Sequence, residues 1–171
     1  MGQLIFLLCV PFLSLIGSSV DDSSHLVGPA SDWVIECPFS IEPISTKPSQ
    51  VNFQYLLIDM QHHWEEKTRF NHKAVKILSQ AGIEKSSQFI INFDPSYQRV
   101  IVHTLKVIRS GKSLDRLGQS QHKLIQREAE LENNLYNGNY TLVYFLDDIR
   151  MGDIIEYAWS VVGTHLVFST H

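Results

Sequence analysis

The chain has 171 residues, of which 44% are hydrophobic and 11% aromatic, and its formal net charge is −4. This length and composition allow one globular domain with a core of its own and argue against disorder. Because Lys and Arg are not in excess and form no basic run, charge offers no basis for binding nucleic acid or an anionic membrane surface.

The first predicted element is a leader. An apolar run extends from Leu4 to Ile16, and small residues follow it up to Ser19. The run is shorter than the roughly 20 residues that a membrane-spanning helix needs, but it fits a secretory signal peptide. We therefore predict a signal-peptide helix over residues 1–19, cleavage near Ser19, and export to the periplasm or extracellular space without a stable membrane span. Because no Lys or Arg precedes the run, a membrane anchor formed by an uncleaved leader is the alternative.

Two irregular segments follow the leader. Residues 20–31 are small, polar and turn-forming, which predicts a flexible lead-in. We expect the folded domain to span residues 32–171. Its first part, from Trp33 to Pro48, contains three prolines, which remove backbone donors and therefore predict an extended segment lying on the domain. Trp33 and Phe39 are its expected anchors.

Alternating apolar and polar side chains then predict the first strands. Val51 to Asp59 has apolar residues at every second position and forms the first of them. Trp64 to Ser79 is ambiguous, because its second half also fits an amphipathic helix. The alternation from Thr68 to Ala74 favours a long strand, and Ala81-Gly82 predicts a turn after it.

The middle of the chain predicts a strand and a hairpin. Ser87 to Phe93 shows the cleanest alternation, and Asp94-Pro95 ends it. Arg99 to Arg109 is long and rich in β-branched residues, which favours a strand. Ser110-Gly111 predicts a tight turn, and a short strand through Leu114 completes the hairpin.

The remaining elements are a strand, a helical turn and a pair of strands. Gln121 to Gln126 is expected to form the strand. Helix formers dominate over residues 127–135, which predicts a short helical turn. Tyr140 to Gly163 alternates in both halves and predicts two strands joined by a short surface turn at DDIRMGD. Many short strands and almost no helix beyond the leader indicate an all-β fold, an antiparallel β-sandwich.

Cys37 is the one cysteine outside the leader, so the mature chain has no intramolecular disulfide. A cysteine beside a histidine is a candidate nucleophile, because the imidazole generates the thiolate. Cys37, however, lies in a proline-rich segment without a helix start behind it. We therefore favour a packed or idle thiol over a catalytic one.

Metal binding is the other chemistry that the residue types suggest. The chain has eight histidines, but His62 and His63 are adjacent and face opposite sides of a strand. No H-E-x-x-H or Cys-His ligand spacing occurs. Asp147, Asp148 and Asp153 are candidate calcium ligands, but their spacing does not follow the twelve-residue loop, which favours a solvated turn. We expect no catalytic, metal or cofactor-binding residue and no cofactor.

Six motifs, in this order, resemble those of a known family. They are YLLIDMQ (55–61), FDPSYQ (93–98), VHTLKVIRSGK (102–112), LIQREAELE (124–132), LYNGNYT (135–141) and LDDIRMGDIIEY (146–157). They are similar to the domain of unknown function found N-terminal to a transglutaminase-like core in exported bacterial proteins. The resemblance spans roughly Asp32 to the end of the chain.

This resemblance implies a β-sandwich accessory domain outside the cytoplasm, followed in the family by a papain-like transglutaminase or peptidase module with a Cys-His-Asp triad. The sequence ends at His171, so no motif position of that module is present and no catalytic residue can be assigned. The leading hypothesis is a non-catalytic exported accessory or binding domain whose partner is such a module, an envelope protein or a glycan. The alternatives are a cysteine hydrolase or transferase that uses Cys37, and a truncated remnant of a larger transglutaminase-like protein.

Overall fold

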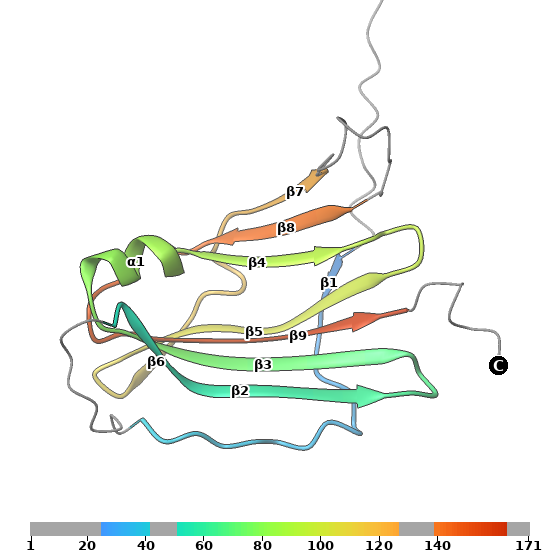
Figure 1. Cartoon of the computed structure of the whole chain (residues 1–171), viewed down its shortest axis with the longest axis horizontal. Helices are drawn as coiled ribbons and strands as arrows, with labels where there is room; N and C mark the ends of the chain where they lie inside the picture. The colour runs from blue at the N-terminus through green and yellow to red at the C-terminus, as the bar shows by residue number, and fades with distance from the viewer. Residues whose placement is uncertain (1–24, 42–50, 127–138, 164–171) are drawn as a thin grey trace, which may run out of the picture.

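A computed structural model describes residues 25–41, 51–126 and 139–163. Within these ranges the chain forms two β-sheets and one short helix (Figure 1). The predicted all-β class is confirmed. The signal-peptide helix expected over residues 1–19 and the helical turn expected over 127–135 lie outside the described residues.

The larger sheet has the strand order β1-β5-β9-β3-β2, with β6 beside β5. Its strands are β1 (His25–Val27), β2 (Phe53–His63), β3 (Thr68–Ile77), β5 (Arg99–Arg109), β6 (Lys112–Asp115) and β9 (Ile154–Val162). Strand β9 is the last of the described strands, yet it lies in the middle of the sheet, antiparallel to both β3 and β5. Strands β5 and β6 form the predicted hairpin, in which Ser110 and Gly111 both have positive φ, as the tight turn between two strands requires.

The smaller sheet contains β4 (Gln88–Phe93), β7 (His122–Gln126) and β8 (Tyr140–Phe145) in the order β4-β8-β7. Tyr140 to Gly163 therefore supplies two strands, as predicted, but they belong to different sheets. Strand β8 pairs with β4 and β7, whereas β9 pairs with β3 and β5. The connection between them passes from one sheet to the other.

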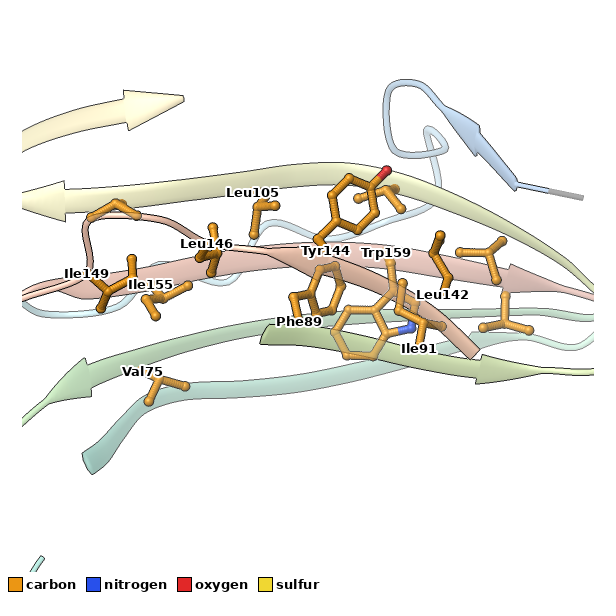
Figure 2. Packing of buried hydrophobic residues seen from close by; sticks show 14 of the residues in the cluster. Val75, Phe89, Ile91, Leu105, Leu142, Tyr144, Leu146, Ile149, Ile155 and Trp159 are labelled. Atoms are coloured by element: carbon orange, nitrogen blue, oxygen red, sulfur yellow. The ribbon is translucent and has the colours of Figure 1, made fainter. Parts of the chain in front are cut away.

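The core lies between the two sheets (Figure 2). Strand β4 alternates strictly, so Phe89 and Ile91 are buried while Ile90 is 46% exposed. Phe89 packs against Trp159 of β9, with ring centroids 5.3 Å apart. Tyr144 of β8 is among the largest fully buried side chains. Each such side chain contributes roughly 1.5–3 kcal/mol through burial alone, which makes this interface the main source of stability.

A helix, α1 (Gln80–Ser86), stands where the sequence predicts a turn at Ala81-Gly82. Ser79 caps it, because its Oγ accepts a hydrogen bond from the Gly82 amide at 3.1 Å. The helix has seven residues and is too short to show a helical repeat of apolar positions. It connects β3 in one sheet to β4 in the other. Among the described residues, no helix is long and apolar enough to cross a membrane.

The connection from β8 to β9 is exposed at most of its positions, as predicted, but its last aspartate is buried. Asp153 is 2% exposed, and its carboxylate accepts hydrogen bonds from Arg109 Nε at 2.9 Å and the Arg150 amide at 2.8 Å. Hydrogen bonds from Arg109 and then Arg150 hold the pKa of Asp148 below its ordinary value. The carboxylates of Asp148 and Asp153 thus both accept hydrogen bonds from arginines. The described part of the chain contains no cluster of metal-ligating side chains.

Part of the lead-in expected to be flexible is ordered. Residues 25–27 form β1, which pairs in parallel with Val100 to Val102 of β5. The imidazole of His25 is buried and lies edge-on to His122 of β7, with ring centroids 4.9 Å apart. A three-residue strand leaves almost no alternation in the sequence, so the prediction missed it.

Candidate functional site

Residues 28–41, here called the strap, cross the outer face of the larger sheet without regular secondary structure (Figure 1). Over residues 33–41 this agrees with the extended segment predicted from Trp33 to Pro48, and residues 42–48 of that segment lie outside the described residues. The side-chain amide of Gln61 both donates to and accepts from the Ile35 backbone, at 2.7 and 2.9 Å. The expected anchors also make contacts: Trp33 Nε1 donates to Glu66 at 3.0 Å, and the Phe39 ring lies 6.3 Å from that of His72.

A groove of about 410 Å³ lies between the strap and the sheet. Strands β3, β5 and β9 supply its floor, and the strap supplies its wall. The polar side chains that line it are His72, His103, Thr104, Lys106 and Glu156 on the floor and Ser31, Glu36 and Cys37 on the wall. The groove therefore collects the thiol, two of the eight histidines and two carboxylates from four separate parts of the sequence.

A β-bulge directs His103 into this groove. Val102 pairs with Trp159 and Thr104 pairs with Ala158, so the register shifts by one residue between them and leaves His103 as the extra residue. Without the shift, His103 and Thr104 would face opposite sides of the sheet. With it, both line the groove on the outer face.

The hydrogen bonds of His103 determine its proton arrangement. Its Nδ1 lies 2.8 Å from the Gly28 carbonyl oxygen, which can only accept, so Nδ1 carries a proton. In the neutral ring, Nε2 then accepts from Ser160 Oγ at 2.8 Å. Burial lowers the pKa of His103 and outweighs the backbone hydrogen bonds, which act in the opposite direction. We conclude that His103 is a neutral clamp that ties the start of the strap to β5.

This clamp predicts a pH-dependent stability. Because the pKa of His103 is lower in the folded state than the ordinary 6.5, the unfolded chain binds more protons, and stability is lost as the pH falls below that value. Unfolding in urea at about pH 8 and about pH 5 should therefore show a smaller loss for His103→Gln than for the unmodified chain. An equal loss in both proteins would contradict this role.

His72 and Glu156 form the second polar pair on the floor. His72 Nε2 lies 3.0 Å from Glu156 Oε1, and both side chains are largely buried. The hydrogen bond from His72 lowers the pKa of Glu156 against the effect of burial, and the charge of Lys106 adds to the shift. Because Glu156 is ionised at neutral pH, His72 Nε2 acts as the donor in this pair.

The structure places Cys37 in the same groove as two imidazoles, which the sequence could not show. Both ring nitrogens of His103 are engaged, and Nε2 of His72 donates to Glu156. Among the described residues, no hydrogen bond links Cys37 to either ring. A cysteine nucleophile needs a base within hydrogen-bond reach, and neither imidazole is hydrogen-bonded to this thiol.

We therefore expect Cys37 to react with iodoacetamide at neutral pH no faster than a cysteine in an unstructured peptide. Rates are measured by mass spectrometry, with His72→Gln as the matched variant. This substitution should leave the rate unchanged, because the His72 ring does not activate the thiol. Faster labelling of the unmodified chain that is lost in His72→Gln would instead favour the cysteine-enzyme hypothesis.

A second surface lies on the inner face of β2, where the larger sheet is not covered by the smaller one. Tyr55, Ile58 and Met60 are 45%, 61% and 56% exposed. Ile58 pairs with Lys73, whose ammonium lies 5.6 Å from the centre of the Trp159 ring in the core. We call Tyr55, Ile58 and Met60 the open strip. The regular alternation predicted for this segment misses it, because the register of β2 shifts between Tyr55 and Leu57.

Comparison with known proteins adds a family and one partial structural likeness. The family model for a domain of unknown function with solved structures, DUF3857, matches residues 65–171. The crystal structure of a "putative protease" from Parabacteroides distasonis ATCC 8503 aligns with a TM-score of 0.48 and 11% sequence identity. That alignment covers 57% of this chain and 19% of the other, so the chain spans about a fifth of that structure. No curated protein matches the chain.

Proposed function

The chain belongs to the DUF3857 family of domains of unknown function, and on this premise we propose that it is a non-catalytic accessory domain of an exported transglutaminase-like protein. Its task is to bind and position a protein partner. The resemblance of its ordered motifs to domains that precede a transglutaminase-like core supports the accessory role. The binding role rests on the open strip, because its apolar side chains lie on the inner face of the larger sheet but are exposed to solvent.

The open strip has the chemistry of a protein interface. In a β-sandwich the inner face of each sheet is normally covered by the other sheet, and apolar area removed from water contributes about 25 cal/mol per Å². Within the described ranges, β4 pairs only with β8, so its other edge is unpaired. Residues of β4 and β2 line one pocket, which places this edge on the side of β2 (Figure 1). A strand added beside β4 would satisfy its backbone groups and cover the strip, as in known β-strand additions. We propose that the transglutaminase-like partner supplies this extended apolar segment.

A capture experiment tests the proposal. The full tagged chain serves as bait for envelope extract, and bound proteins are identified by mass spectrometry. We expect a transglutaminase-like protein to be captured by the unmodified chain and to be lost with Ile58→Glu/Met60→Glu. Ile90→Glu is the matched control, because Ile90 is similarly exposed but lies on the outer face of the smaller sheet. Equal capture by all three baits, or capture of no such protein, would overturn the proposal.

Export is part of the same proposal, and it makes a prediction about the mature protein. If residues 1–19 act as a signal peptide, the secreted or periplasmic fraction should contain a chain that starts near Val20. Intact-mass measurement after fractionation checks this directly. A full-length chain in the membrane fraction would support the uncleaved anchor, and a full-length soluble chain would contradict both.

A further inference from the structure

A third surface lies at the turn between β2 and β3. A groove of about 430 Å³ separates this turn from the connection between β4 and β5. Its lining includes His62, Trp64, Lys67, Arg69, Tyr97 and Gln98. Arg69 pairs with Val161, a core residue of β9, so the groove opens on the inner side of the sheet. It is therefore distinct from the groove beneath the strap.

Trp64 is the exposed aromatic platform of this groove. Its side chain is 85% exposed, the largest value among the exposed large apolar side chains of the described residues. The indole stacks on the imidazole of His62 at a centroid distance of 5.9 Å and an interplanar angle of 20°. The two rings are nearly parallel and offset, so the face of the indole stays accessible. An exposed aromatic face is a ready contact for the flat side of a ligand.

The turn holds this platform in a defined position. The Lys67 amide donates to the Trp64 carbonyl at 3.2 Å, and the Glu66 amide donates to His63 Nδ1 at 3.1 Å. Lys67 itself has a φ of 51°, a left-handed conformation in which glycine or asparagine is more usual. A lysine at this position places a cation on the lining of the groove.

The positive charge beside Trp64 favours an anionic ligand. Lys67 and Arg69 line the groove, and neither forms an ion pair with any side chain that the structure describes. Two acidic residues lie nearby, but the Glu66 carboxylate accepts from Trp33, and neither Glu65 nor Glu66 lines the groove. An arginine binds a carboxylate through paired hydrogen bonds, so an anionic ligand gains both charge attraction and direction.

We propose that this groove binds an acidic glycan, with a sugar ring on the open face of Trp64 and a carboxylate at Lys67 and Arg69. The C–H groups on one side of a pyranose carry partial positive charge and match the negative face of an indole. The amide of Gln98 is a further polar group for the hydroxyls. This site goes beyond the proposed protein-binding function and does not depend on it.

The backbone favours a glycan over an acidic peptide. The strands that floor the groove are already paired, since Thr68 and Arg69 of β3 are matched to β2 on one side and to β9 on the other. A peptide would find no free ladder of backbone groups there and would lose the main contribution to strand-like binding. Recognition through an aromatic face, two cations and an amide does not need such a ladder.

Isothermal titration calorimetry of the purified full chain tests the site. The probes are tetragalacturonate, a hyaluronan tetrasaccharide and a tetrasaccharide of N-acetylglucosamine and N-acetylmuramic acid, with tetraglutamate as the peptide probe. We expect at least one glycan to bind, and its neutral methyl ester to bind at least about tenfold more weakly. Trp64→Ala and Lys67→Gln/Arg69→Gln should each weaken binding of the acid by about tenfold or more. The double variant should also remove the difference between acid and ester.

Lys112→Gln/Lys123→Gln is the matched control, because both lysines are exposed and lie outside the groove. It removes the same charge and should leave binding unchanged. Far-UV circular dichroism and thermal unfolding verify that each variant folds, and Trp64→Phe should retain part of the affinity. Three results would overturn the assignment: no glycan binding at millimolar concentration, binding insensitive to Trp64→Ala, or tetraglutamate binding more tightly than every glycan.

Discussion

Replacing Trp159 by alanine should lower the free energy of unfolding by about 3–5 kcal/mol, the range typical of large-to-small substitutions in a core. Trp159 is 8% exposed and lies on the central strand β9. Its ring contacts Phe89 of the opposite sheet and stacks on Tyr157 of its own strand. The substitution removes the indole from the contact between the two sheets and leaves a cavity that neighbouring strands cannot close.

Urea unfolding followed by circular dichroism measures this loss. Trp64→Ala is the matched control, because it makes the same chemical change at a side chain that is 85% exposed. Its effect should stay within about 0.5 kcal/mol. Trp159→Phe should fall between the two, since a smaller ring still fills part of the space. Equal effects of Trp159→Ala and Trp64→Ala would mean that the sheets do not pack through Trp159.

Replacing Gly82 by alanine should destabilise the chain by about 1–3 kcal/mol, as overpacking does in a tight interior. At an exposed helical site the same substitution would stabilise by roughly 0.5–1 kcal/mol, because alanine has the higher helix propensity. Here an added Cβ would lie 2.1 Å from the backbone oxygen of Asn52, at the start of β2. A backbone atom cannot move aside as a flexible side chain can, so the sign is reversed.

Glu84→Ala is the control for this prediction, because Glu84 is exposed on the same helix. It should change the free energy of unfolding by no more than about 0.5 kcal/mol. Thermal and urea unfolding of both variants separate local packing from helix propensity. A stabilised Gly82→Ala variant would show that α1 does not lie against the beginning of β2.

Side-chain alternation was enough to predict most strands. It located β4 and β5 closely, because their inward positions are apolar and their outward positions are largely polar. The ambiguous stretch from Trp64 to Ser79 forms β3 over Thr68–Ile77, preceded by the turn that carries Trp64. The preference for a strand there is confirmed. Val75 and Ile77 face the core between the sheets, whereas Phe70 lies on the opposite face and lines the groove beneath the strap.

What alternation could not predict depends on contacts between distant residues. Helix α1 is one short element capped by Ser79, and β1 is a three-residue strand whose partner is about 75 residues away. The burial of Asp153 depends on Arg109, which the sequence places 44 residues earlier. The groove beneath the strap likewise requires the bulge at His103, and an extra residue in a strand leaves no mark in a single sequence.

The position of β9 has a consequence for how the polypeptide is made. Of the described strands, β9 is translated last, yet β3 and β5 meet only through it. Until the ribosome has added residues 154–162, the larger sheet exists only as separate hairpins, and isolated hairpins are marginal in water. The larger sheet can therefore close only after β9 has been synthesised, so its long-range pairing forms late relative to the hairpins.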